Sequence, residues 1–192
     1  MKIKIRFATS LCACLLLVAR PRAFPALLLS VTLHELGHIL VARRLGLRFS
    51  SLSLSPIGAA LTPLAGMGGY REEVFVAFAG PAANLLSVIL LPKAPQSSFL
   101  HFFVIFSTFL GLLNLLPIRS FDGGRILLCT FSRLGKPLLG ERILAASSFL
   151  FLFFFWSFSA YLLLRVGASL SLFVFSCSLF CRLFLTPSKP EI

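Results

Sequence analysis

The 192-residue chain has few charged residues and very few acidic ones. Charged residues make up 12% of it and only 6 are Asp or Glu, against 58% hydrophobic residues. Ordinary soluble domains are about a quarter charged, so this chain has too few polar groups to cover a water-facing surface. A soluble enzyme is therefore excluded, and the high hydrophobicity excludes a disordered chain. The mean hydropathy of +0.97 predicts a polytopic membrane protein.

The excess of positive charge does not indicate a nucleic-acid partner. The 18 Lys and Arg residues give a net charge of +12, but they lie between apolar runs, where cations orient membrane spans, and not on one basic face. Most of them fall on one side of the predicted topology, so we expect a multi-pass protein of the cell membrane with both termini in the cytoplasm. Spans of roughly 20 residues predict about six transmembrane helices in an all-α fold, from apolar runs at 7–19, 26–42, 74–91, 99–116, 143–164 and 166–185.

The two ends and the cysteines add little to this organisation. The first run follows three cations like a secretory signal, but Arg20, Pro21 and Arg22 make a poor cleavage site, so we expect it to be retained. The chain ends soon after the last run, which predicts a single domain over 1–192 with no soluble accessory domain. An odd count of 5 cysteines indicates no disulfide framework.

Two connections are unlike simple loops. The stretch containing Ser51, Ser53 and Ser55 alternates polar and apolar residues, which is typical of a strand and predicts a short re-entrant or strand-like segment after the second helix. The stretch 117–124 interrupts apolar sequence with Pro, Arg, Asp and two Gly residues, which predicts a helix break before Asp122. Irregular backbone at membrane depth needs protein or a water-filled cavity around it, so both stretches indicate an internal wet site.

The segment His34-Glu35-Leu36-Gly37-His38 lies inside the second apolar run. Residues four apart share one face of a helix, so the imidazoles of His34 and His38 can reach one metal ion. Glu35 lies about 100 degrees round the helix, where its carboxylate can take a proton from an activated water. A structural polar cluster is the alternative, but ionisable groups inside a membrane are costly. The segment predicts a zinc site with one ion per chain.

A catalytic zinc site has three protein ligands and one open position, so a third ligand is needed. Asp122 is the only aspartate, it follows a proline break, and it would otherwise be an expensive charge against the membrane; we predict that it is the third ligand. The alternatives weigh less: Glu72, Glu73 and Glu141 resemble solvated loop or interfacial charges, His101 an interfacial histidine, and Cys177 and Cys181 buried apolar thiols.

These motifs resemble the site-2 protease family of intramembrane zinc metalloproteases. The resemblance rests on HELGH at 34–38, AGPAAN at 79–84, NLLP at 114–117 and DGG at 122–124. It is strongest to the compact branch typified by the sporulation protease that processes a sigma-factor precursor. It implies zinc ligands at His34, His38 and Asp122, a catalytic glutamate at Glu35, and a role at the transition state or in substrate positioning for Asn114.

The expected activity is hydrolysis of a peptide bond in or near a transmembrane segment of a membrane-embedded protein substrate, as in regulated intramembrane proteolysis. A sigma-factor precursor and an anti-sigma factor are both candidate substrates. Glu35 would move the proton and Asn114 would donate to the developing oxyanion; the alternative for Asn114 is a structural hydrogen bond. We expect Gly80 and Pro81 to serve helix packing.

A substrate helix must unwind before cleavage, and an exposed strand edge would offer it new hydrogen-bond partners. We predict that Ser51, Ser53 and Ser55 form this edge and bind substrate, with a plain surface hairpin as the alternative. A metal-ion transporter or sensor built on the same two histidines and Asp122 is the alternative function; it would not need Glu35 at that position. The sequence leaves open whether a membrane regulatory protein takes part, and it indicates no oligomeric state.

Overall fold

Helices and one small sheet make up the computed structural model, which describes residues 2–5, 23–47, 49–55, 58–63, 69–91, 97–166, 173–174, 176–178 and 180–181. In chain order the elements are β1 (Lys2–Ile5), α2 (Phe24–Arg44), β2 (Phe49–Ser55), β3 (Gly58–Pro63), α3 (Tyr70–Leu90), α4 (Ser98–Asn114), α5 (Asp122–Arg133), α6 (Pro137–Tyr161) and the π-helical turn η1 (Leu162–Val166).

Three of the described helices are long and apolar enough to cross a membrane: α2, α3 and α6 with its extension to Arg165. They correspond to the predicted runs at 26–42, 74–91 and 143–164, and the protein is a helical membrane protein. The run at 7–19 and most of the run at 166–185 lie outside the described residues. The count of about six spans therefore stays a prediction.

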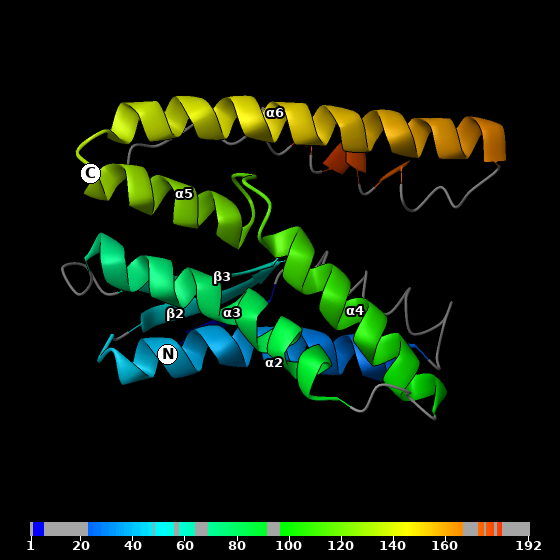
Figure 1. The fold of residues 1–192 in the computed structure, drawn as a ribbon, viewed down its shortest axis with the longest axis horizontal. Coiled ribbons are helices and arrows are strands. Elements are labelled where there is room, and N and C mark those ends of the chain that lie inside the picture. The colour runs from blue at the N-terminus through cyan, green and yellow to red at the C-terminus, as the bar shows by residue number, and fades with distance from the viewer. Residues whose placement is uncertain are drawn as a thin grey trace.

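The predicted run at 99–116 ends in a helix break. The predicted run at 99–116 forms α4, which has 17 residues and spans about 25 Å at 1.5 Å per residue. The helix ends at Asn114, a loop containing Pro117 follows, and α5 begins at Asp122. Figure 1 shows α4 ending near the centre of the molecule and α5 continuing from there to the end where α6 begins. The predicted helix break before Asp122 is confirmed, and it lies deep in the bundle.

Two features of this region differ from the prediction. Residues 122–133 form the helix α5, which is not among the predicted apolar runs. The prediction that Glu141 lies in a polar loop is wrong, because α6 already begins at Pro137. Proline is favoured in the first turn of a helix, where its missing N–H has no intrahelical acceptor to satisfy. The sequence did not predict this start, because Gly140, Glu141 and Arg142 in the first turns of α6 interrupt the apolar run.

Small side chains let α2 and α3 approach closely. The buried residues of α2 include Ala26, Ser30, Gly37 and Ala42, whereas large apolar residues such as Leu40 are exposed. A Cβ atom on Gly37 would meet the backbone of Ala79 on α3. Membrane helices pack in this way because lipid is as apolar as leucine, so association depends on close backbone approach and not on burying large side chains.

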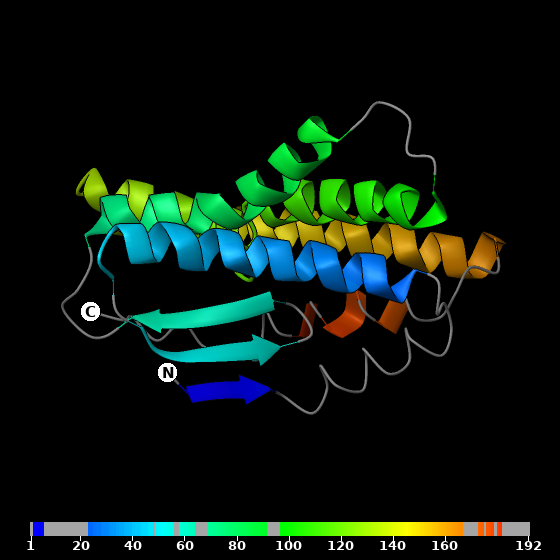
Figure 2. The same ribbon diagram turned by 90° about the horizontal axis from the view of Figure 1, so that it is seen from below.

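The sheet lies on the face of α2 that is turned away from α3 and α4, with β3 the strand nearest to α2 (Figure 2). β1 pairs with β2 in parallel and β2 pairs with β3 antiparallel, which confirms the predicted strand at residues 51–55. The prediction that this strand is an exposed edge is wrong, because β2 is the middle strand. Alternation along a sequence indicates a strand but does not indicate which strands lie beside it.

Candidate metal centre

Two turns of α2 carry the histidines of the centre. His34 and His38 are four residues apart on one helix face, and both are buried, with 5% and 7% of their surface exposed. α2 begins at Phe24 with Pro25 in its first turn and ends before Gly46, whose φ of +72° allows the chain to turn. The histidines therefore lie at the middle of a membrane-length helix and one turn beyond it, on its face toward α3.

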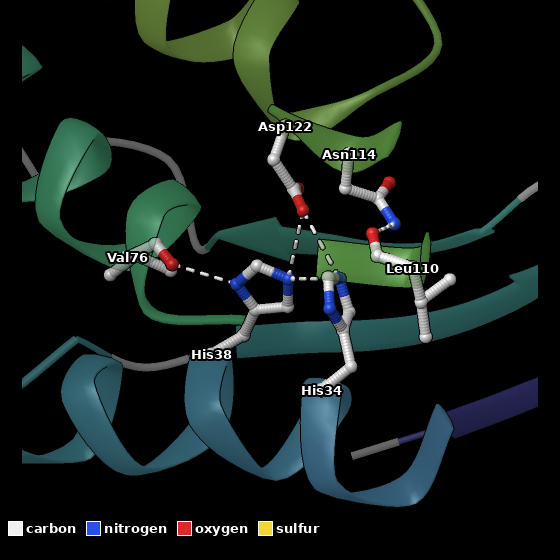
Figure 3. A network of polar contacts seen from close by, with 6 residues as sticks. All are labelled: His34, His38, Val76, Leu110, Asn114 and Asp122. Carbon is white, nitrogen blue, oxygen red and sulfur yellow. Dashed lines mark hydrogen bonds and ion pairs between the residues drawn. The ribbon is translucent and has the colours of Figure 1, made fainter. Parts of the chain in front are cut away.

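The third side chain is that of Asp122, the first residue of α5. Oδ2 of Asp122 lies 3.1 Å from Nε2 of His34 and 3.4 Å from Nε2 of His38, and the two Nε2 atoms are 3.2 Å apart (Figure 3). A carboxylate at a helix N-terminus is stabilised by the helix dipole. The structure thus brings the carboxylate of Asp122 to His34, which is 88 residues away along the chain, and to its neighbour His38.

This triangle fits a tetrahedral zinc ion. Ligand atoms bound to zinc at about 2.0–2.1 Å stand about 3.3 Å from one another, close to the separations observed here. Among the described residues, His34, His38 and Asp122 are the group of His, Cys, Asp and Glu side chains placed to hold a metal ion. Two imidazoles and one carboxylate are also ligand types that zinc prefers.

The backbone of α3 orients one of the imidazoles. Nδ1 of His38 donates a hydrogen bond of 2.7 Å to the carbonyl oxygen of Val76 (Figure 3). A neutral imidazole carries hydrogen on one nitrogen only, so Nε2 of His38 keeps its lone pair and turns it toward His34 and Asp122. The position of Val76 could not be found from the sequence, because a backbone acceptor can be supplied by any residue type.

Gly80 forms the wall of the centre on the α3 side. A Cβ atom at this position would overlap Nε2 of His38 and lie 2.9 Å from Nε2 of His34. The predicted packing role is therefore only part of its function, because the surface packed against Gly80 is the pair of imidazoles. The signal in the sequence was a glycine beside Pro81 inside an apolar run, and it did not indicate what the glycine contacts.

The loop that presents Asp122 is fastened to α6. Ser147 donates through Oγ to the carbonyl oxygen of Pro117 at 2.7 Å, and Ser148 accepts at 2.9 Å from the backbone N–H of Arg119. The guanidinium of Arg119 forms an ion pair with Glu141. These contacts cover irregular backbone with protein, which is the condition for such backbone at membrane depth.

The same loop packs closely against the start of α5. A Cβ atom on Gly123 would overlap the carbonyl oxygen of Leu115, and one on Gly124 would overlap that of Ile118. Phe121, next to Asp122, is buried with Ile118 and with Leu152 of α6. The two glycines and this small apolar cluster fix where the helix begins, and so where the carboxylate of Asp122 lies.

The remaining candidate ligands lie elsewhere. Glu73 accepts from Arg125 at 3.5 Å and from Sγ of Cys129 at 3.3 Å, which joins α3 to α5; it is not among the three side chains placed to hold a metal ion. Glu141 pairs with Arg119, as described above. His101 is exposed in the first turn of α4, and Cys177 and Cys181 are free thiols.

The predicted catalytic and substrate residues have different surroundings. Glu35 is half-buried on α2, between the two histidines in sequence. Asn114 is the last residue of α4, and its Nδ2 donates to the carbonyl oxygen of Leu110 at 2.9 Å (Figure 3). Of the serines, the structure gives the backbone position in β2. The roles predicted for these residues stay predictions.

Membrane-length helices packed around two imidazoles and a carboxylate define a membrane-embedded metalloprotein. Residues 23–92 and 91–158 match Peptidase family M50. The chain belongs to this family.

The chain is similar to two curated relatives and to one solved structure. It is 32% identical over 120 residues to a zinc metalloprotease of Methanocaldococcus jannaschii, covering 57% of this chain and 34% of that protein. It is 31% identical over 124 residues to stage IV sporulation protein FB of Bacillus subtilis, covering 62% of this chain and 43% of that protein. The chain thus spans less than half the length of these relatives. Its fold matches the site-2 protease from Methanocaldococcus jannaschii with a TM-score of 0.60 at 24% identity, over 95% of this chain and 88% of the other.

Proposed function

We propose that this protein is an intramembrane zinc metalloprotease that hydrolyses a peptide bond in or near a transmembrane segment of a membrane-bound substrate. The observation that carries the proposal is the triangle of His34, His38 and Asp122 inside a bundle of membrane helices, with Glu35 beside it on α2. Family membership supports the same reaction class. The three ligands would hold one zinc ion, whose Lewis acidity activates water and polarises a peptide carbonyl.

Glu35 is the residue we assign to proton transfer. It follows the first ligand on α2, so its side chain projects about 100 degrees round the helix from that of His34 and does not take a ligand position. From there the carboxylate would accept the proton of the attacking water and pass it to the leaving amine. A metal-transport site does not require a carboxylate at this offset, and for this reason we prefer hydrolysis to transport.

Asn114 is the residue we assign to the substrate carbonyl. An asparagine amide has two N–H donors, and one of them is bound to the carbonyl oxygen of Leu110. This bond would hold the amide in a fixed orientation, so that the second N–H donates to the oxyanion that develops during hydrolysis.

We propose that the substrate binds in extended form along the edge of β3. β2, which carries Ser51, Ser53 and Ser55, has its backbone engaged by strands on both sides. Among the described strands, β3 is the outer strand nearest to α2. A locally unwound substrate segment added there would replace its lost helical hydrogen bonds with strand pairing. In this arrangement Ser51, Ser53 and Ser55 would lie on the strand next to the binding edge, and their strand would not itself pair with the substrate.

Co-expression with tagged single-span membrane proteins, chosen from those encoded beside sigma-factor and anti-sigma-factor genes, tests the proposal. We expect Glu35→Gln to abolish cleavage while the purified chain keeps one zinc ion, because the substitution removes the proton acceptor and leaves the ligands. Asp122→Asn should instead lower the zinc content. Glu72→Gln is the matched control, a carboxylate in the first turn of α3 and outside the centre, and should keep both zinc and cleavage.

The outcomes separate the candidate functions. Cleavage by Glu35→Gln at the wild-type rate would contradict the role of Glu35. Zinc flux into proteoliposomes that is unaffected by Glu35→Gln and lost in Asp122→Asn would indicate a transporter. Wild-type zinc content in Asp122→Asn would contradict Asp122 as the third ligand.

A further inference from the structure

Three buried polar atoms near the metal centre have no hydrogen-bond partner among the described residues. They are Nδ1 of His34 and both side-chain atoms, Oδ1 and Nδ2, of Asn84. Asn84 lies on α3 and has 0% of its surface exposed. Buried polar atoms are nearly always paired in folded proteins, so unpaired atoms at one place call for a partner or a role.

The packing of α2 on α3 puts these atoms into the same layer of the bundle. The two helices run antiparallel (Figure 1), and Gly80 of α3 lies against Nε2 of His34. Asn84 is four residues beyond Gly80, so it shares the face of α3 that meets His34. Helical side chains lean toward the N-terminus of their own helix. In an antiparallel pair, His34 and Asn84 therefore lean toward each other.

The neighbouring polar groups are already engaged. One turn before His34, Oγ of Ser30 donates to the carbonyl oxygen of Ala26 at 2.9 Å and accepts from Ser107 of α4 at 3.0 Å. This serine pair lies on the side of His34 away from His38, and its hydroxyl groups are bonded to each other and to the backbone of α2. Among the described residues, the unpaired acceptor available to Nδ1 of His34 in this layer is thus the amide oxygen of Asn84.

We propose that Asn84 is a positioning residue for the metal centre, whose Oδ1 accepts the hydrogen on Nδ1 of His34 through one bound water. The proposal rests on the proposed function, because it assigns Nε2 of His34 to the zinc ion. With hydrogen held on Nδ1, Nε2 keeps its lone pair and its direction toward Asp122. His38 is fixed in the same way by the carbonyl oxygen of Val76. α3 would then orient both imidazoles, one through its backbone and one through Asn84.

Zinc affinity of the purified full chain tests this role. Asn84→Leu keeps a similar volume and removes both hydrogen-bonding atoms, and we expect it to weaken zinc binding about 10–100-fold, the usual effect of losing such a partner. Asn84→Asp retains an acceptor and should stay within about fivefold of wild type. Ser107→Ala, a buried polar residue whose partner is Ser30, is the matched control and should leave the affinity unchanged. Affinity is measured by competition with a chromophoric chelator.

Two further measurements separate positioning from a purely structural role. The visible absorption spectrum of the cobalt-substituted chain should change in Asn84→Leu, because His34 loses its fixed orientation. The unfolding temperature of the metal-free chain should change little. Without zinc, the hydrogen of His34 can sit on Nε2 and bond to Oδ2 of Asp122, so Nδ1 needs no acceptor and Asn84 loses no direct protein partner. A structural role predicts the reverse: a lower unfolding temperature and an unchanged spectrum.

Each outcome decides the proposal. If Asn84→Leu does not fold, Asn84→Ala carries the same expected loss of affinity. Wild-type zinc affinity and cobalt spectrum in a folded Asn84→Leu or Asn84→Ala chain would overturn the role of Asn84 and leave the proposed protease function intact. If the wild-type chain itself binds no zinc, the proposed function fails, and the role of Asn84 fails with it.

Discussion

The absence of a side chain at Gly80 matters as much to the metal centre as the ligands do. The imidazoles of His34 and His38 pack directly against its Cα atom, and a methyl group there would occupy the space of Nε2 of His38. Because the wall belongs to α3 and both ligands belong to α2, the overlap can be relieved only by moving the rings or by separating the helices. Either movement would change the distances between the two Nε2 atoms and Oδ2 of Asp122.

We therefore expect Gly80→Ala to weaken zinc binding at least tenfold, while the chain still inserts and folds. Gly111→Ala on α4 is the control, since its new Cβ atom would meet the flexible side chain of Leu85 at 3.0 Å, away from the ligands. Zinc per purified chain and chelator competition measure the difference. Equal zinc affinity in the two variants would show that the rings adjust without cost.

At the scale of elements, the metal centre depends on a helix that carries none of its ligands. α6 supplies Ser147, Ser148 and Glu141, which bind the loop between α4 and α5. This loop has few backbone partners of its own, because Pro117 and the break between the two helices interrupt the helical hydrogen bonds. α6 thus supports Asp122 from outside the centre.

Ser148→Ala tests this support. The substitution leaves the buried N–H of Arg119 without its acceptor, which costs about 1–3 kcal/mol, and it loosens the loop that carries Asp122. We expect a lower free energy of unfolding in mixed detergent micelles and a several-fold weaker zinc affinity. Ser157→Ala, farther along α6, should change neither quantity. A loss of stability with unchanged zinc affinity would mean that the loop holds Asp122 without help from α6.

At the scale of the whole molecule, several basic residues of the described helices gather at one end of the bundle. Arg43 and Arg44 end α2, Arg133 ends α5, and Lys136 precedes α6, and Figure 1 shows these helix ends on the same side. By the positive-inside rule we predict that this end faces the cytoplasm. We then expect the opposite end, where α3 is followed by α4, to face outward.

Cysteine labelling in intact cells tests this orientation. After the native cysteines are replaced, a membrane-impermeant maleimide should label Ser97→Cys, at the start of α4, and should spare Leu45→Cys, at the end of α2. Labelling of both positions after the membrane is permeabilised is the control for accessibility. The reverse pattern in intact cells would place the basic end outside and contradict the predicted topology.

The sequence by itself predicted a membrane protein and singled out the three side chains that the structure brings together, His34, His38 and Asp122. Composition fixes the solvent that a chain can tolerate, and the four-residue spacing of His34 and His38 fixes their common face, since both properties are local. A single intramembrane aspartate after a proline break was a local signal as well.

Only the tertiary structure decided how these parts are held. The middle position of β2, the contact of Gly80 with the imidazoles, the bond from His38 to Val76 and the fastening of the Asp122 loop by α6 all join segments that are distant in sequence. Such contacts depend on how each helix is rotated and which strands pair, and local periodicity does not specify either. The residue types were therefore predictable, whereas the supports that orient them were not.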